Sequence, residues 1–189
     1  MQYLKYILLA LMVCCGCSDR DDETASAEVN PRPWYTWDSC SQNIDDNPCN
    51  FILKNQHGEE VELYDYYGKI IVVDLATMWC GPCGSMSRAS DDIVNLYGKE
   101  NLVWLTLIVE NEYGDPPSEE DLQRWSEMHG VTGHILGADR SIIDSTAEEG
   151  YPVSGWPTYA IVDQEMILKY GTVGWSESLI KQQINSLIQ

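Results

Sequence analysis

Two long apolar runs, one of them interrupted only by Asp74, restrict the fold of this chain more than any other feature. Residues 70–76 (IIVVDLA) and 102–109 (LVWLTLIV) lack the polar-apolar alternation of half-exposed strands. Such runs are typical of strands buried on both faces of a sheet. Residues 83–97 lie between them, carry apolar side chains on one side and end at Gly98, as an amphipathic helix does. The sequence therefore predicts a β-α-β unit at the centre of the fold.

Weaker signals on both sides of this unit predict further strands and helices. They are hairpin strands at 51–53 with 60–63 and at 159–162 with 166–170, and helices beginning after Ser118, at 141–148 and at 176–188. We expect an α/β fold in which a mixed sheet has helices on both faces.

The charge of the chain excludes one large class of partner. Its 11 lysines and arginines face 30 aspartates and glutamates, which gives a formal net charge of -19. Such a surface repels phosphate backbones, so we expect no nucleic-acid binding. Anionic lipid headgroups are repelled too, so attachment to a membrane would need an anchor that is not electrostatic.

Residues 1–17 are predicted to be an export signal of the lipoprotein type. A cationic start precedes the apolar run 6–13, which is too short to span a bilayer. The cysteines that follow resemble the signal of bacterial lipoproteins, which is cut before a cysteine that then carries lipid. Cys17 is the favoured lipidation site, and Cys14 and Cys15 are the other two candidates for the cysteine that follows the cleavage point. A plain signal peptide or a short uncleaved anchor is the alternative.

Residues 18–50 are predicted to form an acidic tether followed by a segment that holds two cysteines. Residues 18–33 are acidic, small and polar, with almost nothing to bury. Cys40 and Cys49 bracket a polar stretch, and a disulfide between them would join the end of the tether to a domain over residues 51–189. Sequence alone does not prove this pairing. Two free thiols, or one zinc site made by all four cysteines beyond the signal, are the alternatives.

The chemistry is predicted at Trp79-Cys80-Gly81-Pro82-Cys83. Cys80 follows a buried strand and opens a helix, whose free N–H groups and dipole lower the pKa of a thiol. Cys80 is therefore the expected exposed nucleophile, and Cys83, one turn further on, is expected to resolve the mixed disulfide. Gly81 and Pro82 form a tight turn that brings the two sulfurs together, and the fixed φ of Pro82 suits a helix start.

The stretch IIVVDLATMWCGPC resembles the thioredoxin superfamily and, more narrowly, the exported TlpA/ResA-like, AhpC/TSA-related thiol-disulfide oxidoreductases. The resemblance runs from about Phe51 to the C-terminus. It implies a thioredoxin-like fold, with a central mixed β-sheet flanked by helices, an N-terminal hairpin and a central insertion. It also implies a redox-active disulfide as the only reactive group, with no metal and no dissociable cofactor.

The same resemblance assigns roles to residues outside the cysteine motif. Asp74 falls where thioredoxins place a buried acid; desolvation would raise its pKa and make it a proton acceptor for Cys83. A capping or solvent-facing aspartate is the alternative. VSGWPTYAIVD resembles the cis-proline segment, which makes Pro157 the candidate and Pro152 the less well placed one. The backbone of Trp156 would then pair with a substrate strand.

Several positions depart from the family pattern or lack a clear match to it. Trp156 replaces the usual small or β-branched residue, and Arg88 stands where many relatives have a proline that kinks the helix. With Trp79, Gly81 and Pro82, Trp156 is expected to contact the substrate.

Glu110 and Glu112 lie near the position of a functional acid in some ResA-like proteins. Their loop is acidic throughout, so we expect both on a solvated face. We expect surface or loop positions for His57, His129 and His134.

These observations predict a membrane-anchored thiol-disulfide oxidoreductase that faces the periplasm or another extracytoplasmic space. The Gly-Pro pair resembles thioredoxin, a reductant near about -270 mV, which favours reduction of client disulfides, with apocytochrome c as one possible client. A membrane thiol transporter would supply the electrons. One alternative is a peroxiredoxin-like peroxidase, since Thr77 lies three residues before Cys80. The other is a thioredoxin-fold lipoprotein that binds without catalysis.

Overall fold

The computed structural model describes residues 32–188. The chain divides into two compact units, Met1–Thr36 and Trp37–Gln189. Of the first unit only residues 32–36 are described, so the predicted signal, Cys17 and most of the tether lie outside the described residues. The second unit holds all the helices and strands described below.

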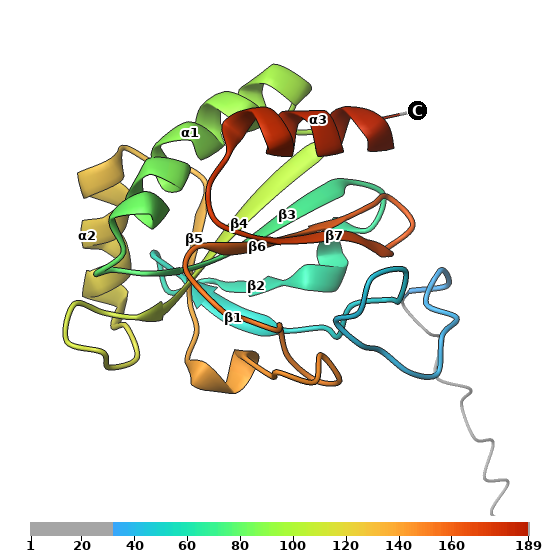
Figure 1. Cartoon of the computed structure of the whole chain (residues 1–189), viewed down its shortest axis with the longest axis horizontal. Helices are drawn as coiled ribbons and strands as arrows, with labels where there is room; N and C mark the ends of the chain where they lie inside the picture. Colours follow the sequence, from blue (N-terminus) through green and yellow to red (C-terminus); the bar gives the residue numbers. More distant parts are fainter. Residues whose placement is uncertain (1–31, 189) are drawn as a thin grey trace, which may run out of the picture. The chain divides into compact units, whose positions relative to one another are not determined.

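The second unit is built on a sheet of seven strands in the order β2-β1-β5-β4-β3-β6-β7 (Figure 1). The strands are β1 (Ile52–Asn55), β2 (Glu60–Glu62), β3 (Ile70–Thr77), β4 (Leu102–Glu110), β5 (His134–Gly137), β6 (Thr158–Val162) and β7 (Leu168–Val173). The pairs β3–β4 and β4–β5 are parallel, and the other pairs are antiparallel. The predicted mixed sheet is thereby confirmed, with the two apolar runs as its central strands.

Three α-helices and two short 3-10 helices complete the unit. They are α1 (Gly81–Tyr97), α2 (Glu119–His129), α3 (Glu177–Leu187), η1 (Leu63–Tyr66) and η2 (Arg140–Ile142). The predicted cap of α2 is present, since the Ser118 side chain accepts from the backbone N–H of Asp121 and the Asp121 side chain accepts from that of Ser118.

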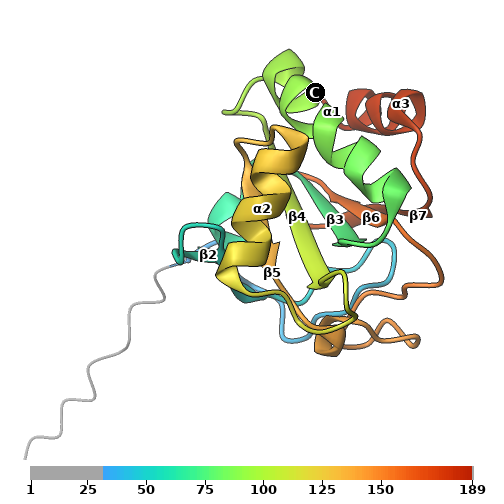
Figure 2. The same cartoon turned by 90° about the vertical axis from the view of Figure 1, so that its left-hand side faces the viewer.

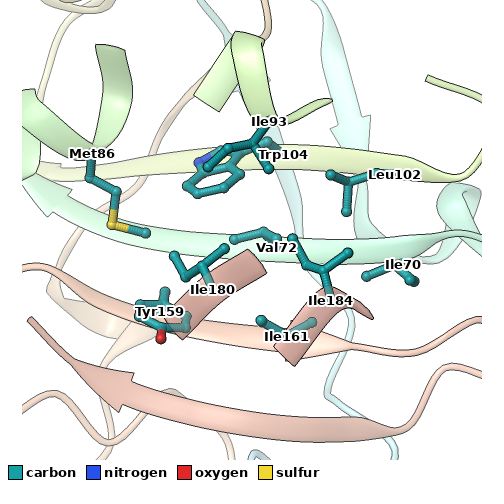
Figure 3. Packing of buried hydrophobic residues seen from close by; sticks show 10 residues of the cluster. All are labelled: Ile70, Val72, Met86, Ile93, Leu102, Trp104, Tyr159, Ile161, Ile180 and Ile184. Carbon is teal, nitrogen blue, oxygen red and sulfur yellow. The ribbon is translucent and has the colours of Figure 1, made fainter. Parts of the chain in front are cut away.

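All three α-helices lie on one face of the sheet, while η1, η2 and loops lie on the other (Figures 1 and 2). On β3, Val72 packs in a core cluster with residues of α1 and α3, and Ala76, on the same face, packs in a cluster with residues of α2. Figure 3 shows the first cluster, in which α3 contributes Ile180 and Ile184. Helices were expected on both faces; in the described residues the second face carries only the 3-10 helices η1 and η2, and the α-helices share the first face. The run β3-α1-β4-α2-β5 crosses the sheet in one direction, and right-handed crossovers then place both helices on the same face.

The prediction of a helix at 141–148 is wrong. Only Arg140–Ile142 form a 3-10 turn. The Asp144 carboxylate accepts from the backbone N–H groups of Thr146 and Glu148, at 2.9 and 3.2 Å, and Ala147 has a φ of 60°. An aspartate that bonds its own following backbone in this way competes with a helix and favours a turn.

Residues 37–50, which include the Cys40/Cys49 segment, belong to the same compact unit as the sheet and helices. The backbone N–H of Asp45 donates to Leu168 O at 2.7 Å, and that of Leu168 donates to Asp46 O at 2.9 Å. Cys40 and Cys49 form a disulfide across the same segment. Because these hydrogen bonds join backbone groups, they leave no pattern in the side chains of the segment.

Candidate active site

The end of β3 and the start of α1 place the two cysteines of the WCGPC motif. Cys80 is the N-cap of α1, with an extended backbone at φ -93° and ψ 107°, and Pro82 lies in the first turn. The helix therefore begins at Gly81, two residues earlier than predicted. Cys80 and Cys83 form a disulfide, and the Cys83 backbone N–H donates to Cys80 Sγ at 3.2 Å. Backbone N–H groups at a helix start stabilise a thiolate at this position once the disulfide is reduced.

The two sulfurs differ in access to solvent. Cys80 is 7% exposed and Cys83 is fully buried, so only Cys80 is open to an incoming disulfide. Cys80 was predicted to be an exposed nucleophile, but in this oxidised form its side chain is largely buried. It packs in a core cluster with Ala76 and Trp125, against which Trp156 also lies.

Asp74 is fully buried in the middle of β3 rather than on the surface. It faces the same side of the strand as Ala76, which packs with both cysteines, so it lies on the face of the sheet that carries the disulfide. Asp74 Oδ2 accepts long hydrogen bonds from Trp104 Nε1 at 3.5 Å and Thr106 Oγ1 at 3.3 Å. Asp74 Oδ1 has no hydrogen-bond partner among residues 32–188.

This environment makes Asp74 a weak acid. Burial raises the pKa of the Asp74 carboxyl to about 7, and the hydrogen bonds from Trp104 and Thr106 oppose the shift only in part. A carboxyl with a pKa near neutrality can accept and release a proton under physiological conditions.

The cis-proline segment lies beside the motif. The peptide bond between Trp156 and Pro157 is cis. Pro157 immediately precedes β6, whose first residue, Thr158, pairs with Leu75 of β3. The indole ring of Trp156 is 6.3 Å from that of Trp79, centroid to centroid, with an interplanar angle of 84°. The structure therefore brings together two separate parts of the sequence, the Trp79–Cys83 stretch and the cis-proline at Pro157.

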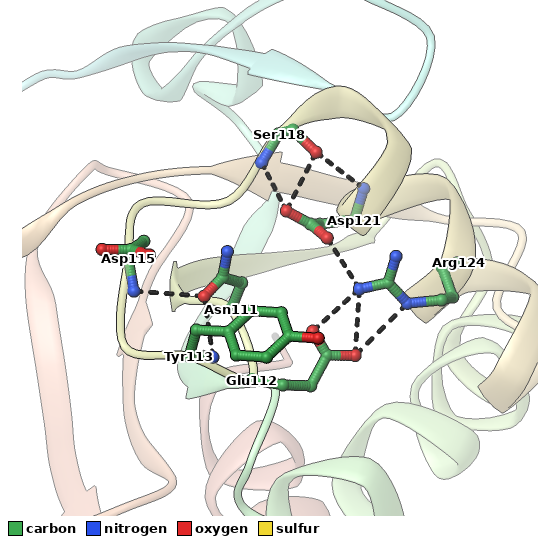
Figure 4. A network of polar contacts seen from close by, with 7 residues as sticks. All are labelled: Asn111, Glu112, Tyr113, Asp115, Ser118, Asp121 and Arg124. Carbon is green, nitrogen blue, oxygen red and sulfur yellow. Dashed lines mark hydrogen bonds and ion pairs between the residues drawn. The ribbon is translucent and has the colours of Figure 1, made fainter.

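Glu110 is a site residue that the sequence interpretation missed. It was expected on a solvated face, but it is 4% exposed. Its Oε2 accepts from Trp79 Nε1 at 3.0 Å, and its Oε1 forms an ion pair with Arg140. Glu112, two residues later, does lie on the solvated face, where it is paired with Arg124 (Figure 4).

His129 is a second residue close to the motif that was expected elsewhere. It is the last residue of α2, and its ring lies 4.2 Å from that of Trp125. Its Nδ1 is 2.9 Å from an Arg88 guanidinium nitrogen, and burial and Arg88 lower its pKa. A methyl group added at Gly84 would lie 2.5 Å from the imidazole. A glycine inside a predicted helix was the sequence signal for this close contact.

The other two histidines have no contact with the cysteine motif among the hydrogen bonds and ring contacts of residues 32–188. His57 is exposed in the turn between β1 and β2. His134 in β5 is only partly exposed and lies 3.1 Å from the Tyr66 hydroxyl, and burial lowers its pKa.

The structure gives no support to the zinc alternative. Cys40 pairs with Cys49 and Cys80 with Cys83, so the four sulfurs are divided between two disulfides. Among residues 32–188, no group of three or more histidine, cysteine, aspartate or glutamate side chains is arranged to hold a metal ion. Within the same residues, every helix is too short or too polar to cross a membrane.

Comparisons with known proteins agree with this geometry. The AhpC/TSA family model matches residues 44–171. The thiol-disulfide oxidoreductase ResA of Geobacillus thermodenitrificans is 26% identical over 139 residues, covering 73% of this chain and 74% of the relative. ResA of Bacillus subtilis is 26% identical over 138 residues, covering 72% and 71%.

Solved structures show the same fold. The pneumococcal exposed lipoprotein thioredoxin of Streptococcus pneumoniae superposes with a TM-score of 0.59 at 28% identity. The match covers 74% of this chain and 100% of that chain. A thioredoxin-family thiol:disulfide interchange protein of Chlorobium tepidum gives a TM-score of 0.60 at 16% identity, covering 80% and 99%. The predicted thioredoxin-like fold and the resemblance to ResA-like redoxins are confirmed. The chain belongs to the AhpC/TSA family and is a thiol-disulfide oxidoreductase.

Proposed function

We propose that this protein reduces disulfides of client proteins on the extracytoplasmic side of a membrane, to which a lipid on Cys17 holds it. The observation that carries the proposal is the position of Cys80 at the N-cap of α1, where its sulfur accepts the backbone N–H of Cys83. This position favours the thiolate and leaves Cys80 as the accessible sulfur of the pair.

The exchange proceeds in two steps that transfer two electrons. The Cys80 thiolate attacks one sulfur of the client disulfide, which forms a mixed disulfide and releases the other client sulfur as a thiolate. Cys83 then loses its proton and attacks Cys80, which releases the second client thiolate and closes the Cys80–Cys83 disulfide. In our proposal, Asp74 accepts the proton of Cys83, because its raised pKa suits a base at neutral pH.

The client is held by the surface around the disulfide. The backbone beside the cis peptide at Trp156 and Pro157 offers hydrogen-bonding groups to an extended client segment. Trp79, Gly81 and Pro82 form the opposite side of this binding surface.

The direction of the reaction is proposed from the residues between the cysteines. Gly81 and Pro82 resemble thioredoxin, whose potential of about -270 mV makes it a reductant. Continued reduction then needs an electron donor, for which we propose a membrane thiol transporter, with apocytochrome c among the clients. The ResA relatives, named as thiol-disulfide oxidoreductases, support exchange but not a direction.

The membrane location is proposed from the sequence pattern at residues 1–17. The pneumococcal relative is itself described as an exposed lipoprotein. A lipid anchor also suits a chain of net charge -19, whose surface would be repelled by anionic headgroups.

A trapping experiment tests the exchange. The reduced Cys83→Ala variant should form a stable covalent adduct with a disulfide-containing protein, and the adduct should map to Cys80. The Cys80→Ala variant should trap none under the same conditions, and the double variant Cys40→Ala/Cys49→Ala should reduce the substrate like wild type. Absence of adducts together with no dithiol-dependent reduction by wild type would refute the proposal. Consumption of hydrogen peroxide by the reduced protein would favour the peroxidase alternative.

The anchor is tested separately. Cells expressing the full chain and fed a labelled fatty acid should label the protein, and Cys17→Ser should abolish both label and membrane association. Label that persists in Cys17→Ser but disappears in Cys14→Ser or Cys15→Ser would move the lipid to that residue. Membrane association without label would favour an uncleaved anchor.

A further inference from the structure

Trp79 holds an unusual position for a large apolar side chain. It is 51% exposed, immediately before the reactive Cys80. Its indole N–H donates to Glu110 Oε2 at 3.0 Å, so the ring does not rotate freely on the surface. An exposed ring that is fixed by a hydrogen bond provides contact area at a low cost in side-chain entropy.

Glu110 is itself fixed from two directions. It is 4% exposed, and its second oxygen is ion-paired with Arg140, which lies in the segment between β5 and β6. The backbone carbonyl of Glu110 accepts the N–H of Met78 at 2.9 Å. Glu110 therefore holds both the backbone before Trp79 and the Trp79 ring.

A β-bulge creates this arrangement. The register between β3 and β4 shifts between Ala76 and Thr77, so that Thr77 pairs with Glu110 rather than with Val109. The shift places Glu110 beside Thr77, two residues before Trp79, at the end of the central strands.

Trp156 is the second aromatic side chain beside the disulfide. Its ring meets the Trp79 ring edge to face, with centroids 6.3 Å apart and an interplanar angle of 84°. Trp156 also packs against the core cluster that contains Cys80 and Cys83. The two rings thus contact one another and form an apolar corner beside the disulfide.

We propose that Glu110 and Arg140 are positioning residues that hold Trp79 opposite Trp156, and that the resulting corner selects client segments with an aromatic side chain next to the reactive cysteine. This inference rests on the proposed disulfide exchange. An aromatic side chain fits best because it can stack on one ring while meeting the edge of the other. The charge of Glu110 is compensated by Arg140, so it offers no local attraction to a basic side chain.

Competition between matched substrates tests the selection. Three disulfide-linked peptides of equal length and equal net charge would carry Phe, Ala or Lys beside the cysteine, with the charge of the Lys peptide balanced elsewhere. The reduced wild-type protein should reduce the Phe peptide with a kcat/KM roughly 3- to 10-fold above that of the Ala peptide, mainly through KM. Because both rates come from one enzyme sample, their ratio does not depend on the fraction of folded protein.

Variants separate the positioning role from general stability. Trp156→Ala should bring the Phe/Ala ratio close to one, and Glu110→Ala and Arg140→Ala should lower it by about half or more. Glu110→Gln keeps an acceptor for the Trp79 N–H and should retain more of the ratio than Glu110→Ala. The control Glu112→Gln, from the same loop but paired with Arg124, should leave the ratio unchanged. The Trp79 indole N–H resonance, assigned by its loss in Trp79→Phe, should shift in Glu110→Ala and not in Glu112→Gln.

Two failures are distinguishable. Equal rates for the Phe and Ala peptides, or a ratio that survives Glu110→Ala and Trp156→Ala, would overturn the selection while leaving disulfide exchange intact. Preference for the Lys peptide would also overturn it, in favour of a cation-binding corner. No reduction of any peptide by wild type would refute the proposed function itself.

Discussion

The backbone N–H of Cys83 points at Cys80 Sγ across the first turn of α1, at 3.2 Å. In the reduced protein the same N–H would face the Cys80 thiolate, together with the other unpaired N–H groups of the helix start. Hydrogen bonds to the charged form of an acid favour ionisation and lower its pKa.

We therefore expect Cys80 to be alkylated as a thiolate well below the ordinary thiol pKa of about 8.5. Iodoacetamide reaction of the reduced Cys83→Ala variant, followed from pH 4 to 10, measures this. The rate should rise with pH and level off at least one unit below the midpoint for a free cysteine peptide. A midpoint equal to that of the peptide would remove the physical basis of the nucleophile.

Asp74 should make stability depend on pH. Its folded pKa, about 7, lies above the unfolded value, so the folded state holds the proton more tightly. The contribution of Asp74 to the free energy of unfolding is fully present at acidic pH. This contribution, a few kcal/mol in total, is lost as pH rises through about 7. Oxidised Asp74→Asn should therefore be more stable than wild type at pH 8, and the difference should vanish near pH 4.

Urea unfolding of the oxidised proteins at several pH values measures the effect, because no thiol titrates in that form. A difference that is constant over this pH range would show that Asp74 keeps an ordinary pKa. In the activity assay, Asp74→Asn should prolong the mixed disulfide, since the second step loses its proton acceptor.

The strands and the motif could be predicted because their constraints are local. A strand that is buried on both faces shows in its own composition, as residues 70–76 and 102–109 do. The cap position of Cys80 follows from a strand, a cysteine and Pro82 in sequence. The resemblance to thioredoxins assigned Asp74 its place, and its burial agrees with that of the whole strand.

Glu110 could not be predicted, because its role depends on residues far apart in the chain. The loop that follows β4 is acidic throughout, and nothing in its composition shows which carboxylate turns inward. The bulge after Ala76 and the arrival of Arg140 from another segment decide it. The same holds for residues 41–47, whose backbone bonds to the segment around Leu168 leave no trace in side-chain pattern.

The Cys40–Cys49 disulfide should contribute stability but not catalysis. It closes a loop with a sequence separation of 9, for which the chain-entropy model gives about 2–3 kcal/mol. Cys40→Ala/Cys49→Ala should lose about this much in urea unfolding and keep its rate of disulfide reduction. Loss of the rate at conditions where the variant is fully folded would indicate a role in exchange. Substitution is preferable to a reductant, which would also open Cys80–Cys83.

Gly84→Ala should lower the stability of the protein, although alanine favours a helix more than glycine does. Helix propensity alone predicts a gain of up to about 1 kcal/mol for Gly84→Ala. The added methyl group would lie 2.5 Å from the His129 ring, which is held by Trp125 on one side and Arg88 on another. Displacing a packed ring typically costs about 1–3 kcal/mol, so we expect a net loss of stability.

A double-mutant cycle isolates this contact. His129→Ala removes the ring, so Gly84→Ala should be neutral or stabilising in that background, with a coupling energy of at least about 1 kcal/mol. Urea unfolding of the four proteins gives the coupling directly. Additive effects would mean that the ring moves aside without cost, and that Gly84 is not needed for the packing of α2 against the active-site helix.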